Sequence, residues 1–320
     1  MSSHEYVLVG VDDSEGGRAA VRYGASQAAR LGWPLRLVHV WPGGMSMVGV
    51  GMDAYPVVEG EHERLGSDLL NEQADLAAKL APGTEVSTVL IRGERLTELV
   101  DAADEAGLTV LGDQHRPVLD RVTTGSVLAT VASRASRPVV AVPANWEQGP
   151  AHDGVVAAVK SCAESKDFVR QAMRIAAEQD LPLTLLHAWQ LPMIYDEYIS
   201  ERTGDDAGQH QAKLELEKIV ASAREGALVE VPVRVVIHHG QPARALIDAS
   251  ARADLLLLAR RRHGFPTGHL GWTGRAVLRE AWSPVEVLPA AAAQTDLDSL
   301  VLEASGAIVK GGERATNLPA

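Results

Sequence analysis

The sequence predicts an α/β protein of two tandem lobes, each built on a doubly wound, mostly parallel five-stranded sheet. Three observations carry this prediction. Apolar runs of strand length alternate with longer segments of helical periodicity, the pattern of β-α-β units. Glycine or proline borders most of the apolar runs, as expected where strands meet turns. The whole order then repeats at an offset of about 147 residues, which indicates a tandem duplication.

The first half contains five strand-length apolar runs separated by helical segments. Residues 6–12 form a short β run, and Ser14 then opens a helical segment that Gly32 and Pro34 end. The last run follows Pro138 and is mostly β-branched, which is typical of a buried parallel strand. The expected strands are 6–12, 35–40, 86–91, 108–111 and 139–142, and the expected helices are 14–31, 61–80, 96–106 and one beginning near 125.

The second half repeats these features. LTLLHAW at 183–189 matches LRLVHVW at 35–41, and Gly274 is taken as the counterpart of Gly125. The other expected strands of this half are 155–159, 233–237, 254–258 and 284–288. We therefore expect a first lobe at 1–147 and a second lobe at 148–290, with a polar linker at 144–153. The tail at 291–320 has no counterpart in the first half and is expected to be partly disordered.

The composition is that of a globular chain of about two domains. The 320 residues are 46% hydrophobic and 22% charged, with a formal net charge of −12. This charge disfavours nucleic acid and anionic membranes as partners. No apolar run approaches the ~20 residues that span a bilayer, and the polar start MSSHEY is unlike a signal peptide. Cys162 is the single cysteine, so we expect no internal disulfide and a cytoplasmic location.

The stretch 108–143 carries the most specific functional signal. A strand-length run ends at Gly112, and Gly125-Ser126 opens a helix, whose N-terminus with its unpaired N–H groups is a candidate phosphate site. The pattern resembles the universal stress protein family, whose nucleotide-binding members carry Gly-x-x-Gly, nine residues, then Gly-Ser and often a further Ser or Thr. Gly112, Gly125 and Ser126 match this pattern. His115 stands in place of its second glycine, and Val127 follows the serine.

Over about residues 4–290 the chain resembles a tandem, actinobacterial member of that family. The resemblance implies two flavodoxin-like (adenine nucleotide alpha hydrolase-like) lobes that pair through their last strands as a pseudo-dimer. It also implies binding of ATP, or of AMP or ADP, with Mg²⁺ accompanying the nucleotide. In the family, an aspartate at the position of Asp12 contacts the adenine–ribose portion, and the backbone at Val40 reads the adenine edge. His115 either obstructs the phosphate or donates a hydrogen bond to it.

Several alternatives stay open at this point. Asp12 fits equally well beside the N-cap of the following helix, and Gly112 and Gly125 can serve turn geometry alone. The leading hypothesis is a non-enzymatic stress-response protein in which nucleotide in the first lobe biases contact with an unknown protein partner. A homodimer is also open. The alternatives are a nucleotide-independent interaction module with degenerate loops and, more weakly, a slow ATPase.

The second half departs further from the family pattern. Lys160 stands in place of the aspartate, Ala259 in place of the first glycine, and Arg275 follows Gly274 in place of the serine. The run 260–263 (RRRH) has three interpretations: a solvated surface, a different anion site, or docking against acidic surface of the other half.

Motifs of the common enzyme classes are missing from the sequence. It contains no Gly-x-x-x-x-Gly-Lys-Ser/Thr loop and no Gly-x-Ser-x-Gly elbow. His238 and His239 are adjacent and would point to opposite faces of a strand, which argues against a shared metal site. Cys162 has no base near it in the sequence. At most, weak ATP hydrolysis fits these observations.

Overall fold

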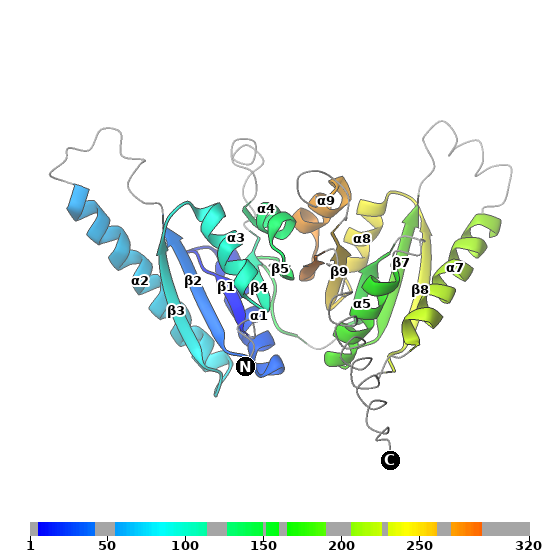
Figure 1. Ribbon diagram of the computed structural model, residues 1–320, viewed down its shortest axis with the longest axis horizontal. Helices are drawn as coiled ribbons and strands as arrows, with labels where there is room; N and C mark the ends of the chain where they lie inside the picture. Colours follow the sequence, from blue (N-terminus) through cyan, green and yellow to red (C-terminus); the bar gives the residue numbers. More distant parts are fainter. Residues whose placement is uncertain are drawn as a thin grey trace, which may run out of the picture.

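The structure, a computed structural model, shows two halves of similar architecture side by side (Figure 1). It describes residues 6–41, 55–113, 127–149, 152–159, 165–189, 206–225, 230–260 and 270–289. The helices α2 (Tyr55–Leu80) and α7 (Asp206–Arg224) lie at opposite ends of the molecule. Between them the strands of both halves form the centre of the fold.

The described part of the first half alternates strands and helices as expected. Helix α2 begins at Tyr55, six residues before the expected start at residue 61. The expectation was wrong because Gly60 is a poor helix former and therefore indicated a loop. The elements are β1 (Val7–Gly10), α1 (Glu15–Leu31), β2 (Leu35–Trp41), α2, β3 (Val86–Arg92), α3 (Arg95–Glu105), β4 (Leu108–Gly112), α4 (Val127–Arg134) and β5 (Val139–Val142).

The described part of the second half repeats this order. Strand β8 continues past the expected residue 237 and includes His239. The elements are β6 (Val155–Ala158), α5 (Lys166–Glu178), β7 (Leu183–Trp189), α7, β8 (Val233–His239), α8 (Pro242–Ser250), β9 (Leu255–Ala259), α9 (Trp272–Glu280) and β10 (Val285–Leu288).

The strands form one sheet with the order β3-β2-β1-β4-β5-β10-β9-β6-β7-β8. Neighbouring strands are parallel within each half, whereas β5 and β10 pair antiparallel and join the halves. The expected pairing of the lobes through their last strands is confirmed. Because β5 and β10 pair with each other, neither is left as an open edge that invites aggregation.

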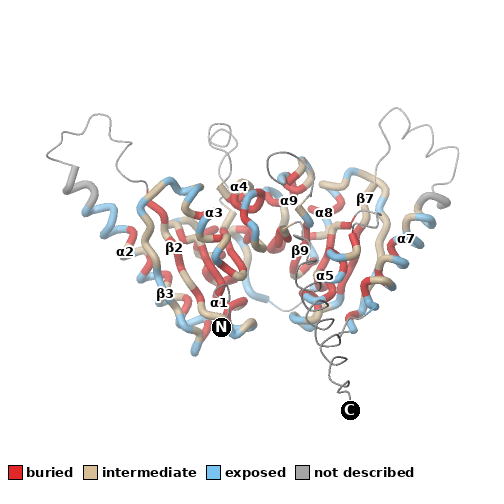
Figure 2. The backbone as a smooth tube through the Cα atoms, viewed as in Figure 1, coloured by how far each residue is buried: buried red, intermediate tan, exposed pale blue. Residues whose placement is uncertain are grey.

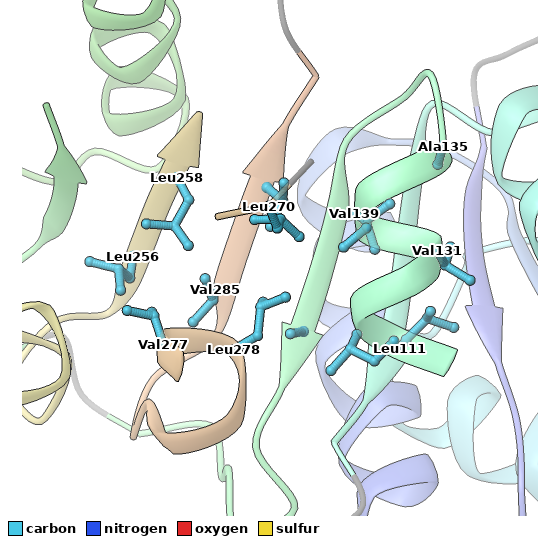
Figure 3. Close-up of a cluster of buried hydrophobic side chains, with 14 of the residues drawn as sticks. Leu111, Val131, Ala135, Val139, Leu256, Leu258, Leu270, Val277, Leu278 and Val285 are labelled. Atoms are coloured by element: carbon cyan, nitrogen blue, oxygen red, sulfur yellow. The ribbon is translucent and has the colours of Figure 1, made fainter. Parts of the chain in front are cut away.

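Helices cover both faces of the sheet. On one face lie α1 and α2 in the first half and α5 and α7 in the second; on the other lie α3, α4, α8 and α9. Figure 2 shows buried residues following the strands in both halves. On the α4–α9 face, one hydrophobic cluster takes side chains from both halves (Figure 3), including Leu111, Val131, Val139, Leu256, Leu258, Val277 and Val285. The two lobes therefore share a core and fold against each other.

Helix α1 shows how local sequence sets the ends of an element. Ser14 is its N-cap, and the Ser14 hydroxyl accepts a hydrogen bond from the Gly17 backbone N–H at 3.0 Å. Gly32 ends the helix with φ 66°, a left-handed conformation that glycine adopts without steric cost. Both ends agree with the expected helix at 14–31.

The glycine that corresponds to Gly125 is Gly271, so the expected match with Gly274 is wrong. Strands β5 and β10, which follow α4 and α9, are 146 residues apart at both ends, since 285 minus 139 and 288 minus 142 each give 146, and the same offset carries Gly125 to Gly271, the N-cap of α9. Gly274 is buried inside the helix, where a Cβ would meet the side chain of Leu270 at 2.6 Å. The sequence comparison failed here because 264–274 contains four glycines at similar spacing.

Arg260, at the end of β9, binds the second half to the first. Its Nη1 donates to the carbonyl oxygens of Ser133 at 3.0 Å and Ala135 at 2.5 Å, at the C-terminal end of α4, where the helix dipole favours a cation. Burial lowers the pKa of Arg260, and Asp104 opposes this effect. Of the three interpretations of the run 260–263, docking against the other half is confirmed for Arg260. Its acceptors are backbone carbonyls at the end of α4 and not an acidic surface. Residues 261–263 lie outside the described residues.

Replacing Arg260 by alanine is expected to lower the free energy of unfolding by about 2 kcal/mol, because two carbonyls lose a charged donor at the junction. Urea denaturation of the full chain measures this effect. Arg279→Ala is the matched control, since Arg279 is exposed on α9 and pairs only with the neighbouring Glu280 among the described residues. Its expected cost is below ~0.5 kcal/mol. Equal effects of the two substitutions would contradict the role of Arg260.

Candidate functional site

The strand order of the first half creates a switch point between β1 and β4. From β1 the chain runs to β2 and β3 on one side, then returns through α3 to β4 and β5 on the other. In doubly wound sheets, ligands bind in the crevice outside the carboxyl ends of the strands at such a point. Strands β1 and β4 end together, since Gly10 pairs with Leu111. Asp12 and Gly112, two of the predicted site residues, lie at this edge.

Asp12 organises the turn between β1 and α1. Its Oδ1 accepts hydrogen bonds from the backbone N–H of Ser14, at 3.2 Å, and from the Ser14 hydroxyl. Ser14 in turn caps α1. The N-cap alternative is therefore correct in one respect: Asp12 orients the capping serine, and its side chain is half-buried at this edge of the sheet. This hydrogen bonding holds the carboxylate in a fixed position at the switch point.

Gly112 allows the start of α1 to approach the end of β4. A Cβ on Gly112 would collide with the carbonyl group of Gly16 and would lie 2.8 Å from the backbone N of Gly17. A Cβ on Gly16 would in turn meet the carbonyl oxygen of Asp113 at 2.5 Å. Gly112 is not among the described residues with positive φ. Its role is close packing of the β4 backbone against the α1 backbone, and the alternative of turn geometry alone is wrong for this glycine.

Helix α4 begins at the same edge of the sheet. Val127, half-buried, is the first described residue of α4, which agrees with the expected helix beginning near 125. Gly125, Ser126 and His115 themselves lie outside the described residues. The described chain therefore brings Asp12, Gly112 and the N-terminus of α4 to one edge, where strand ends and a helix start meet.

Val40 contributes backbone and core packing near the end of β2. Its side chain is buried in the core, so a ligand would meet its backbone, as the resemblance implies. Trp41 follows it and stacks on His62, with ring centroids 6.1 Å apart and planes at 13°. The guanidinium of Arg92 lies 5.5 Å from the Trp41 ring. These contacts hold the end of β2 against β3 and α2.

Two histidines that sequence reasoning missed hold the first strand of each half. His39 Nδ1 lies 2.8 Å from the carbonyl oxygen of Val11, the residue before Asp12. Because a carbonyl only accepts, Nδ1 is the protonated nitrogen. His187 makes the equivalent contact to the carbonyl oxygen of Val159 at 3.0 Å. The repeated histidine in LVHVW and LLHAW is the signal that predicts such a pair.

The second half presents different chemistry at its equivalent edge. Ala259, exposed at the end of β9, stands in place of Gly112 as expected. With Gly271 as the helix-start glycine, Trp272 occupies the position of Ser126, and its side chain is 82% exposed. The expected replacement of the serine by Arg275 is wrong, since Arg275 lies one turn into α9. Lys160 lies outside the described residues.

Among the described residues, no group of three or more His, Cys, Asp or Glu side chains is arranged to hold a metal ion. His238 and His239 are adjacent in β8, and the ring of His239 packs on Trp189 with centroids 4.6 Å apart. No helix in the described chain has the length and apolarity needed to cross a membrane.

Comparisons with known proteins agree with this architecture. The model of the universal stress protein family matches residues 5–143 and again 153–289. Universal stress protein Rv2623 of Mycobacterium tuberculosis is 31% identical over 297 residues, covering 88% of this chain and 95% of that protein. Universal stress protein Rv2005c of the same species is 30% identical over 297 residues, covering 88% and 96%.

Solved structures show the same fold. The crystal structure of a universal stress protein from Archaeoglobus fulgidus has a TM-score of 0.65 and 18% sequence identity, covering 91% of this chain and 99% of that one. Two family matches cover nearly the whole of both halves, and mycobacterial relatives align over most of their length. This chain is a member of the universal stress protein family, with two family domains in tandem.

Proposed function

We propose that the first lobe, residues 1–147, binds an adenine nucleotide in the crevice between the ends of β1 and β4. The observation that carries this proposal is the switch point, where Asp12, the backbone of Gly112 and the start of α4 come to one edge of the sheet. The nucleotide is ATP, with AMP and ADP as related ligands and Mg²⁺ as its companion ion.

Each predicted residue has a role in this proposal. Asp12 contacts the adenine–ribose portion, and the backbone of Val40 reads the adenine edge. The phosphates lie at the N-terminus of α4, where Gly125, Ser126 and the N–H of Val127 meet the positive end of the helix dipole.

Two more residues shape the phosphate end of the crevice. Gly112 lets the start of α1 lie directly against the end of β4. His115 donates a hydrogen bond to phosphate in place of a glycine backbone.

The proposal is restricted to the first lobe. In the second lobe, residues 148–290, Trp272 takes the place of the serine and Ala259 that of the first glycine. An indole ring at a helix start offers phosphate neither the hydroxyl nor the open backbone of Gly-Ser. The tail at 291–320 has no part in the proposal.

We infer that the protein acts without catalysis, as a cytoplasmic stress-response factor. Bound nucleotide shifts the equilibrium of a partner-binding surface only by binding one conformer more tightly than the other. A nucleotide-independent interaction module is the second candidate, favoured by the aromatic replacement at Trp272 in one of the two lobes. A slow ATPase is the third.

Calorimetric titration of ATP, with and without Mg²⁺, into nucleotide-free protein tests the proposal. We expect one site per chain, lost in Gly125→Asp, because a carboxylate at the helix start repels phosphate. Gly271→Asp, at the equivalent position of the second lobe, is the matched control and retains binding. Two sites per chain would contradict the restriction to the first lobe.

The same preparation separates the alternatives. If no heat and no thermal shift occur at millimolar ATP, nucleotide binding is wrong and the interaction module is the better description. If ADP accumulates with time and the Gly125→Asp variant stops its release, the protein is an ATPase.

A further inference from the structure

The antiparallel pair at the centre of the sheet brings a single carboxylate to the junction of the lobes. In the register of β5 and β10, Val285 faces Ala141 and Val287 faces Val139. The axis that relates the two lobes therefore passes between the central pair, Glu286 and Val140. Apart from Glu286, both strands consist of valine, alanine and leucine (VVAV and VEVL).

Glu286 is buried on the face covered by α1 and α5. Alternate residues of a strand face opposite sides, so Glu286 points away from the α4–α9 cluster that contains Val285 and Val287. Its neighbour on the same side, Leu288, belongs to the core beneath α5. Glu286 is only 8% exposed. The side chain of Glu286 therefore lies in the joint between the lobes.

Within the described part of the chain, four titratable groups act on Glu286 from the two covering helices. Tyr23 and Arg30 belong to α1, and Arg174 and Glu178 belong to α5. Arg30 donates across the junction to the backbone oxygen of Glu178 at 3.2 Å, and it also binds a glutamine on its own helix. Arg174 lies 3.2 Å from the carboxylate of Glu178. Strands β5 and β9 present only apolar residues to this region.

Both arginines are thus engaged by other acceptors. Among the described residues, no ion pair within 4.0 Å reaches Glu286. An ionised carboxylate in such a place is costly unless it gains a partner or water. Arg30 is the cation that acts most strongly on Glu286. If Arg30 turned to pair with the carboxylate, it would give up its hydrogen bond to Glu178, which crosses the junction.

We propose that Glu286 is a pH-responsive element that sets how tightly the two lobes are joined on the α1–α5 face. With the carboxyl protonated, α1 and α5 close over the junction as in the structure. With the carboxylate ionised, the charge draws in Arg30 or water, and the Arg30–Glu178 contact opens.

Burial favours the protonated form of Glu286, so the fold is more stable at low pH than at high pH. Burial raises the pKa of Glu286 to about 7; Arg30 and Arg174 lower it, and Glu178 raises it. Because the folded pKa exceeds the unfolded one, the protonated carboxyl stabilises the fold fully at low pH. That stabilisation is lost as the pH rises through about 7. Acidification below neutrality therefore tightens the junction.

The tandem arrangement is what makes a single carboxylate feasible here. In a symmetric dimer of identical lobes, the residue at the axis faces its own copy, and two glutamates there would repel each other. In this fused chain, the two positions differ, with glutamate on β10 and valine on β5. A single glutamate at the axis therefore requires two lobes that differ at this position, as the two lobes of this fused chain do.

Thermal unfolding of the full chain between pH 5 and 8 tests the proposal. We expect the wild-type midpoint to fall by about 5 °C more than that of Glu286→Gln over this range, because the amide has no proton to lose. The matched control is Glu72→Gln, the same change at an exposed position on α2, which keeps the wild-type profile. Identical profiles for wild type and Glu286→Gln would overturn the proposal.

Hydrogen exchange supplies a readout specific to the junction. After correction for the intrinsic rate, the amides of Val139–Val142 and Val285–Leu288 should exchange several-fold faster at pH 8 than at pH 6 in wild type but not in Glu286→Gln. If the variant fails to fold, carbon NMR of the Glu286 carboxyl in wild type decides the question directly. A midpoint near 7 supports the proposal, and a midpoint below 5.5 overturns it.

Discussion

Replacing Val140 by glutamate is expected to leave little folded protein at pH 8. Val140 is fully buried and directly faces Glu286 across the antiparallel pair. Opposed side chains in such a pair have Cβ atoms about 5 Å apart. Two carboxylates at that separation repel by about 3 kcal/mol at an effective dielectric constant of 20, in addition to the desolvation of the new charge. The total approaches the whole stability of a typical domain.

The companion substitution makes this prediction specific. The double variant Val140→Glu with Glu286→Val moves the single carboxylate to the other side of the axis, and we expect it to recover most of the lost stability. Val140→Gln, similar in size but uncharged, should cost less than Val140→Glu, and the difference should be larger at pH 8 than at pH 5. Soluble yield and urea midpoints measure all three. If Val140→Glu keeps the wild-type midpoint at pH 8, the junction is not packed as the structure shows.

Gly112→Ala is expected to lower the free energy of unfolding by about 2–3 kcal/mol and to abolish nucleotide binding. The added Cβ meets the backbone of Gly16 and Gly17, which cannot rotate away as a flexible side chain would. Helix α1 must therefore move from β4, and with it Ser14 and the turn that holds Asp12. Because the same displacement reaches both the core and the crevice, stability and ATP binding should fall together.

The control for this prediction lies elsewhere in the same lobe. A Cβ on Gly60, an exposed residue within α2, meets nothing within 4 Å. Gly60→Ala should therefore raise stability by up to ~1 kcal/mol and leave ATP binding unchanged. Urea denaturation and calorimetry on the two variants give both quantities. Wild-type binding in Gly112→Ala would show that the ligand does not use the crevice between β1 and β4.

The sequence predicts most of this fold because local rules agree with it. Ser14 and Gly32 have the side-chain and backbone chemistry of helix ends, and both lie at the ends of α1. The strand runs are short, apolar and bounded by glycine or proline, so their existence follows from the pattern. The length of α2 does not, because helix propensity is a weak guide and α2 contains Gly60 in spite of its low helix propensity.

The site was predicted less completely, for physical reasons. The role of Gly112 depends on the distance between two backbones that are far apart in sequence. The hydrogen bond of His39 depends on the neighbouring strand in the same way. Gly271 was missed because spacing alone cannot choose among four nearby glycines. Glu286 gave a visible signal, a charge within an apolar run between prolines, but its meaning depends on Val140 in the other half.

The pairing of β5 with β10 can form only late in the synthesis of the chain, because the two strands are far apart in the sequence. After β5 leaves the ribosome, about 145 more residues must be added before β10 exists, which takes roughly 7–30 s at typical rates of translation. During that interval the edge of β5, with Val139, Val140 and Ala141, lacks the partner strand it has in the finished protein. The first lobe therefore carries an unpaired strand edge until β10 has been synthesised, and conditions that slow elongation lengthen its exposure.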